Sequence, residues 1–187
     1  MFKKITLESS NRILFYYPAE EIFNEVSLMS SFMTKNLSGD ASVMDEFAIS
    51  DDERNLFDVC VRQTLPNIYE TMLKITSPID DAFDDAYEVK EGADGFKGAG
   101  TSATERAAGV YIQMCLADND AYNSNVLSLI DASLLNCIKY GILREFYSTC
   151  LNTDLHAISN NKFIEELTLL KKRLFQLKKK KAISSLS

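Results

Sequence analysis

Four long segments of this chain carry apolar residues at spacings of three and four, the pattern of a helix with one buried face. The first begins after Pro18 and ends at Gly39, and the second runs from Ser50 to Thr76. The third extends from about Asn125 to Cys150, and the fourth follows the segment "ISNN" at 158–161. Four such faces must be buried against one another, so the spacing predicts a four-helix core.

In each segment, the regularly spaced apolar residues are expected to face the core. The second segment also has a capping box, since Ser50 is followed three residues later by Glu53. Pro66 is expected to kink this helix, because its ring clashes with the preceding turn. In chain order the four stripes are Ile22, Val26, Met29, Met33 and Leu37; Phe57, Cys60, Val61, Leu65, Ile68, Met72 and Ile75; Leu127, Ile130, Leu134, Ile138, Ile142 and Phe146; and Phe163, Leu167, Leu170, Leu174 and Leu177.

Two stretches have the alternation of β-strands instead. Residues 1–17 form an N-terminal β element, a hairpin with a turn at "ESSNR". Residues 77–108 lose helical periodicity and contain a glycine-rich segment, after which Val110, Ile112, Met114 and Leu116 alternate on one face. We expect this second excursion to be a projecting β-hairpin arm with a long, flexible loop, because loops of this length are usually functional or disordered.

The length of 187 residues suits a single domain with one core. The expected fold class is therefore mainly α (α+β), spanning 1–187, with a basic C-terminal helix and tail at 160–187. No uninterrupted apolar run approaches the roughly 20 residues needed to cross a bilayer. The N-terminus also lacks the apolar stretch of a secretory signal. We expect a soluble protein that stays in the cell in which it is made.

Charge is distributed unevenly along the chain, whose net charge is −7. Residues 162–187 hold eight basic and two acidic residues, whereas the preceding residues hold twelve basic and 25 acidic ones. Seven cations fall within eleven residues near the C-terminus. A cluster of this kind binds phosphates, an acidic neighbour or an anionic membrane surface, and the competing interpretation is a solvated helix end. The cations are Lys171, Lys172, Arg173, Lys178, Lys179, Lys180 and Lys181.

A second charged cluster, of opposite sign, precedes the glycine-rich segment. It is interpreted as a solvated acidic surface, with a docking surface for a basic partner or a surface that repels DNA as the alternative. The spacing of a calcium-binding EF-hand loop is absent. The candidate residues are Asp80, Asp81, Asp84, Asp85 and Glu88.

Motifs of catalysis are not found. Gly95 and Gly100 have P-loop separation, but Thr101 stands where the lysine is required. His156 is the single histidine, which disfavours a catalytic triad or a transition-metal site. The four cysteines are far apart and are expected to be reduced core thiols. We therefore expect that the protein is not an enzyme and that it binds neither a cofactor nor a metal ion.

The order of elements resembles that of the small head-tail connector proteins of tailed bacteriophages, which form the neck or ring, including those of crAss-like phages. The resemblance covers roughly residues 20–181. It lies in "ISDDERNLFDVCVRQTLPNIYETML", "VYIQMCLADNDAYNSNVLSLIDASLLNCIKYGILREFY" and "FIEELTLLKKRLFQLKKKK". The family pattern has a shorter β excursion and often a Trp near Phe146, and both features differ here.

The resemblance implies a structural virion protein, made in the host cytoplasm, that assembles as a homo-oligomeric ring. Its implied partners are the portal, neighbouring neck or tail proteins and the double-stranded DNA passing through the channel, with no membrane. An acidic lining would let DNA slide, while the basic helix would attach to acidic neighbours, DNA or the portal. The alternative is a DNA-associated regulatory or packaged accessory protein that uses its basic tail.

Overall fold

The computed structural model describes residues 5–6, 12–38, 47–73, 87–88, 109–115 and 124–177. Its long helices are α1 (Ala19–Ser38), α3 (Arg54–Leu73), α4 (Ser124–Thr149) and α5 (Thr153–Leu177), and a short 3-10 turn, η1 (Asp51–Glu53), leads into α3. The strands are β1 (Ile5–Thr6), β2 (Arg12–Pro18), β3 (Tyr87–Glu88) and β4 (Gly109–Cys115). The mainly helical fold with four long helices and an N-terminal hairpin confirms the predicted fold class.

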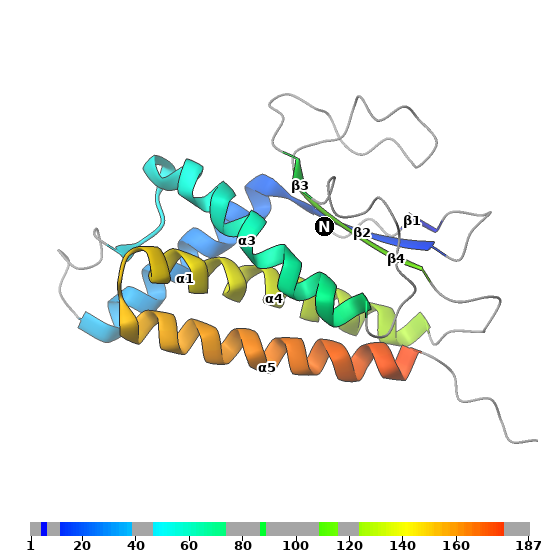
Figure 1. Ribbon diagram of the computed structural model, residues 1–187. Helices are drawn as coiled ribbons and strands as arrows, with labels where there is room; N and C mark the ends of the chain where they lie inside the picture. The colour runs from blue at the N-terminus through cyan, green and yellow to red at the C-terminus, as the bar shows by residue number, and fades with distance from the viewer. Residues whose placement is uncertain are drawn as a thin grey trace, which may run out of the picture.

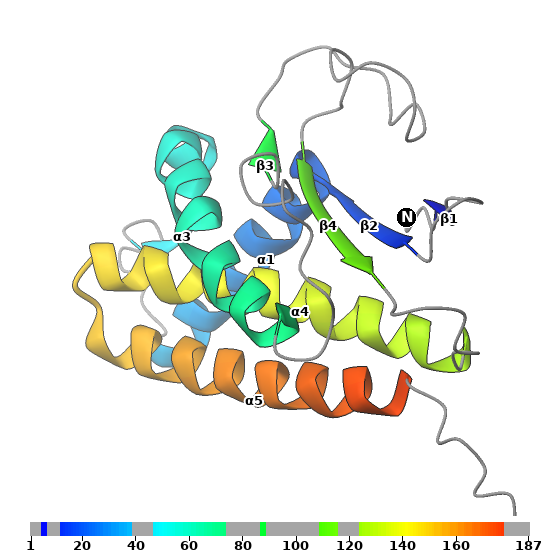
Figure 2. The ribbon, with the colours of Figure 1, turned by 45° about the vertical axis from the view of Figure 1, so that its right-hand side comes forward.

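The strands form one antiparallel sheet in the order β1-β2-β4-β3. The sequence predicted two hairpins, the second of them projecting. Instead, β2 and β4 pair along their whole length, with Phe15 opposite Ile112, and this pairing joins the hairpins (Figure 2). The described part of the second hairpin is therefore held against the first. The glycine-rich segment at 92–100 and Leu116 lie outside the described residues.

Helix α4 is the centre of the helical layer. It packs along α5 and also contacts α3 and α1 (Figure 1). All six residues of its predicted inward stripe are buried, and so are several neighbours such as Leu143 and Tyr147. Because α4 has partners on several sides, it is apolar around more of its circumference than a helix with a single buried face.

The central position of α4 explains why this helix is apolar enough to resemble a membrane span, although it contains no uninterrupted apolar run of about 20 residues. By length and composition, Val126–Thr149 is apolar enough to cross a membrane, with a mean hydropathy of 1.5. However, 56% of this stretch is buried inside the protein. A core helix of a globular protein meets the same criterion, so this feature is weak evidence for a membrane span.

The start of α3 follows the sequence prediction closely. The Ser50 hydroxyl accepts a hydrogen bond from the Asp52 amide, and the Glu53 carboxylate accepts one of 2.7 Å from the Ser50 amide. This is the predicted capping box. The preceding residue, Ile49, is tied to α1, because its amide donates to Ser30 and its carbonyl accepts from Ser27.

Helix α5 starts earlier than predicted. The "ISNN" segment reads as a loop, but it lies inside a helix that begins at Thr153. The Asn152 side chain caps this helix by accepting a hydrogen bond of 3.0 Å from the Leu155 amide. Leu155 and Ser159 are buried and extend the inward stripe toward the N-terminus. The predicted boundary at residue 160 is therefore wrong.

Candidate interaction surfaces on helices α1 and α5

The described residues of the basic cluster point in different directions from α5. Lys171 and Lys172 are exposed and have no ion-pair partner among the described residues. Arg173 is half-buried and donates a hydrogen bond of 2.7 Å to the Leu129 carbonyl oxygen on α4, together with a second bond to the Ser133 hydroxyl. The structure thus directs two lysines outward and the arginine inward. Lys178, Lys179, Lys180 and Lys181 lie outside the described residues.

The predicted acidic cluster is largely beyond the described part of the chain. Asp80, Asp81, Asp84 and Asp85 lie outside it, and Glu88 is described only as a backbone position of β3, paired with Gly109. Their role as a channel-facing or docking surface therefore remains a prediction.

The outer side of α5 also carries large apolar side chains. Ile164 is 52% exposed and Phe175 is 59% exposed. Together with Thr168 and Lys171 they are spaced at i, i+4, i+7 and i+11, which places them on one face of the helix. We call Ile164, Thr168, Lys171 and Phe175 the α5 face. The inward stripe on the opposite side holds the helix to the core through Phe163, Leu170, Leu174 and Leu177, all buried.

A comparable surface lies on α1. Leu28 is 59% exposed and Phe32 is 57% exposed, four residues apart, and the exposed carboxylates Glu21 and Glu25 precede them on the same side. We call Glu21, Glu25, Leu28 and Phe32 the α1 face. The sequence contained a signal for it, because Leu28 and Phe32 fall outside the inward stripe of that helix. That signal was missed.

The acidic end of the α1 face borders a surface pocket between α1, β2 and α4. In this pocket the Tyr17 hydroxyl donates a hydrogen bond of 2.8 Å to the Asp131 carboxylate. Burial raises the pKa of Asp131, although the bond from Tyr17 acts in the opposite direction. Burial also raises the pKa of Tyr17 well above its usual value, and the Asp131 charge adds to that shift. The pocket is lined by Tyr16, Tyr17, Pro18, Glu21, Ile22, Glu25, Asp131 and Leu135.

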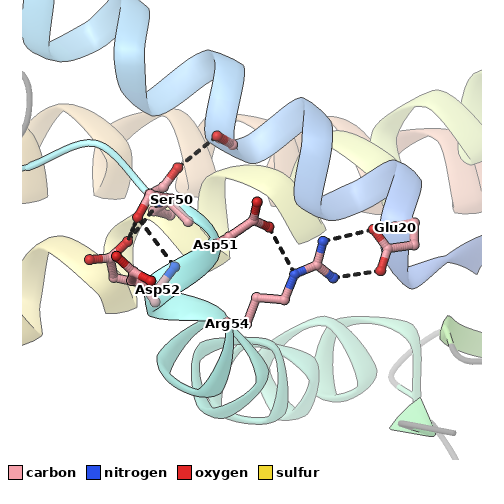
Figure 3. A network of polar contacts seen from close by, with 8 residues as sticks. Glu20, Ser50, Asp51, Asp52 and Arg54 are labelled. Carbon is pink, nitrogen blue, oxygen red and sulfur yellow. Dashed lines mark hydrogen bonds and ion pairs between the residues drawn. The ribbon is translucent and has the colours of Figure 1, made fainter. Parts of the chain in front are cut away.

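A polar network fixes the start of α1 against the start of α3 (Figure 3). The Arg54 guanidinium donates to both carboxylate oxygens of Glu20, and its Nε donates to Asp51 at 3.1 Å. The guanidinium also lies 4.0 Å from the centre of the Phe23 ring. The hydrogen bond from Arg54 lowers the pKa of Glu20. These exposed groups are engaged with one another, so the network orients α1 within the subunit.

The described residues hold no group of three or more His, Cys, Asp or Glu side chains suited to a metal ion. Cys60 and Cys137 are free and buried, and Cys150 is free and half-buried. Burial raises the pKa of Cys60 to about 12, which keeps this thiol protonated at neutral pH. The burial of Cys60 and Cys137 fits the expectation of core thiols, and their reduced state stays a prediction. The side chain of Cys115 is not described.

No protein-family model matches the chain, and neither a curated protein nor a solved structure matches it. Functional inference therefore depends on the residues themselves.

Proposed function

We propose that this protein is a structural assembly subunit, a ring-forming head-tail connector of a tailed-phage virion. The observation that supports this proposal most directly is the two-sided character of α5. One side of the helix is buried against α4 and α3, while the other presents exposed apolar residues beside exposed lysines. Contiguous apolar groups bordered by polar ones are typical of protein-protein contact sites.

The division of the basic cluster supports the same proposal. Arg173 attaches α5 to its own subunit, whereas Lys171 and Lys172 stay in solvent at the same level of the helix. The lysines are then positioned to meet an acidic partner without disturbing the fold. Under this proposal the partners are further copies, the portal, neighbouring neck or tail proteins and the DNA in the channel.

Mass spectrometry and negative-stain microscopy of purified virions test this function. We expect the protein among the virion components, as a ring at the portal vertex. Its absence from virions would rule out the connector function.

A pair of variants tests whether the basic end attaches the subunit. Changing Lys178–Lys181 to Gln is expected to leave thermal stability unchanged and to weaken virion incorporation in a salt-dependent way. Leu170→Ala is the matched contrast, because Leu170 is fully buried, and it is expected to lower the free energy of unfolding by about 2–5 kcal/mol. Normal incorporation of the Gln variant at every salt concentration would make the cluster a solvated helix end.

The exposed lysines of α5 also favour a second candidate, the DNA-associated accessory protein. This function predicts binding of the isolated chain to duplex DNA, with an affinity that falls steeply as salt increases. The connector function does not require such binding by the isolated subunit, because the DNA passes through the channel of the assembled ring. A titration of labelled duplex DNA at two salt concentrations separates the two candidates.

A further inference from the structure

The α1 face and the α5 face have matching geometry. Glu21, Glu25, Leu28 and Phe32 follow the spacing i, i+4, i+7 and i+11, and the four residues of the α5 face follow the same spacing. Each set extends about 16 Å along its helix at 1.5 Å per residue. Alternating steps of four and three are the spacing of helices that pack side by side in coiled coils.

We propose that the α1 face of one copy packs antiparallel against the α5 face of the next copy. This inference rests on the proposed function as an assembly subunit and names the contact by which copies meet. The occupant of each face is then a second copy of this chain, because the two faces have complementary chemistry. The α1 face combines apolar groups with carboxylates, and the α5 face combines apolar groups with Lys171.

The antiparallel direction follows from the order of residues on each helix. On the α1 face the acids come first and the apolar residues second, whereas on the α5 face Ile164 comes first and the lysine later. Antiparallel packing sets Glu25 opposite Lys171 and Phe32 opposite Ile164. It also sets Leu28 opposite Thr168 and Glu21 opposite Phe175, so one carboxylate faces an apolar ring. Parallel packing would set Phe32 opposite Phe175, but it would also set Leu28 opposite Lys171 and Glu21 opposite Ile164. Two charges would then face apolar groups and no carboxylate would face a lysine, so the antiparallel direction is favoured.

In this contact, Glu25 would interact with Lys171 of the neighbouring copy in addition to a lysine of its own subunit. Glu25 already forms an ion pair of 2.8 Å with Lys139 of its own subunit. Its carboxylate has two oxygens and accepts more than one donor, so Lys171 of the neighbour adds a second cation without displacing the first. Lys172, next to Lys171 on the exposed side of α5, provides a further positive charge near Glu21.

The position of the two helices makes the contact head-to-tail. Both α1 and α5 pack on α4 and have no extensive contact with each other. In both ribbon views α5 runs along α4, whereas α1 crosses α4 at an angle (Figures 1 and 2). A single neighbour therefore does not cover both faces of one copy. Repeating such a heterologous contact produces a closed ring if the rotation closes and a filament if it does not.

Two single variants test the contact in the purified full-length chain. Phe32→Ser removes the ring at the apolar end of the α1 face, and Ile164→Ser truncates the residue expected opposite it on the α5 face. Val59→Ser changes a similarly exposed apolar residue on α3 as a control. By sedimentation equilibrium up to the highest soluble concentration, we expect the wild type to associate beyond the dimer. Each of the two face variants should associate at least about tenfold more weakly, and the control should match the wild type.

Mixing Phe32→Ser with Ile164→Ser gives a sharper result. Each retains one intact face, so a mixture is expected to form a one-to-one complex that does not grow further. A wild type that is monomeric at all concentrations, or that stops at a dimer, would overturn the head-to-tail contact. Phe32→Ser that assembles like the wild type would also overturn it.

Cysteine pairs test the direction of packing. A chain with Phe32→Cys and Ile164→Cys should form intermolecular disulfides under mild oxidation, because antiparallel packing brings these positions together. A chain with Phe32→Cys and Phe175→Cys, which parallel packing would join, should crosslink no more than the wild type. The reverse pattern would contradict the antiparallel arrangement. Neither measurement uses virions, so the connector function can fail while this contact stands, and the contact can fail for a protein found in virions.

Discussion

The Arg173 guanidinium of α5 donates a hydrogen bond of 2.7 Å to the backbone carbonyl oxygen of Leu129 on α4. Leu129 follows the first turn of α4, and Arg173 lies one turn before the end of α5. The bond therefore joins the two antiparallel helices at the end opposite their connecting turn. It also stabilises the part of α5 from which the exposed lysines project.

We expect Arg173→Gln to lower the free energy of unfolding by roughly 1–2 kcal/mol, since it removes hydrogen bonds from a charged donor. Lys171→Gln is the matched control and should change stability by less than about 0.5 kcal/mol, because the side chain is exposed. Urea denaturation of both variants measures the difference. Equal effects of the two changes would show that the inward orientation of Arg173 contributes nothing.

A second prediction concerns the pH dependence of stability at Asp131. Burial raises its pKa above the ordinary value of 3.8, so the folded state holds this proton more tightly than the unfolded chain does. The contribution of Asp131 to stability is therefore greatest below that ordinary value and falls as pH rises through the raised pKa. Asp131→Asn keeps an oxygen to accept the Tyr17 bond and should remove this fall.

The measurement is the free energy of unfolding from about pH 3 to pH 7 for the wild type and the Asn variant. The variant should gain stability relative to the wild type as pH rises. Tyr17→Phe provides the complementary test, because loss of a bond that lowers the Asp131 pKa should move the fall to higher pH. A constant difference between the wild type and Asp131→Asn would refute the prediction.

Gly141 lies where α3, α4 and α5 meet. A Cβ atom at this position would come within 2.2 Å of the Thr64 methyl carbon and 3.1 Å of the Phe163 ring. Gly141→Ala is therefore expected to destabilise the protein by about 1–3 kcal/mol through overpacking.

Adding Thr64→Ala should recover part of that loss, since it removes the closest atoms. The Thr64 hydroxyl is buried and has no hydrogen-bond partner among the described residues, so its removal breaks no hydrogen bond with them. A double-mutant cycle by thermal denaturation checks the coupling. Additive effects of the two changes would contradict the proposed clash.

The turn between α4 and α5 offers a stabilising change. Leu151 has a φ of 56° and is 86% exposed, and the amide of Asn152 donates back to the Tyr147 carbonyl at 3.0 Å. This is the geometry of a helix C-terminus that favours glycine. Leu151→Gly should raise stability by about 1 kcal/mol, whereas Leu151→Ala keeps the Cβ atom and should give no such gain. Melting temperatures of the two variants decide between them.

Helical periodicity predicted the core well because it reports which side of a helix is buried. The inward stripe of α4 from Leu127 to Phe146 is buried throughout. The start of α5 was placed too late, because "ISNN" has loop-forming residues and only the buried contacts of Leu155 and Ser159 reveal its helical state. The pairing of β2 with β4 leaves no trace in local periodicity, since it joins residues distant in the chain.

The candidate surfaces were predicted less completely for a related reason. Charge is visible in a sequence, but the orientation of each charge is not. Arg173 and Lys172 are adjacent, yet one bonds to α4 and the other remains exposed, because only Arg173 lies beside Leu129 and Ser133. Leu28 and Phe32 fall outside the predicted inward stripe of α1, so their exposure could have been predicted from the sequence.

The pairing of β2 with β4 has a consequence for the order of folding. The α4–α5 hairpin joins neighbouring segments through a short turn, so it forms with little loss of chain entropy. The sheet requires Phe15 to meet Ile112, across the whole of α1 and α3, and contacts between such distant residues form slowly. During synthesis, β2 leaves the ribosome long before β4 exists, and its Phe15 and Tyr17 side chains lack their final neighbours throughout that interval. The early chain therefore passes through a state with an unpaired strand edge, which is the stage at which this protein is most exposed to aggregation.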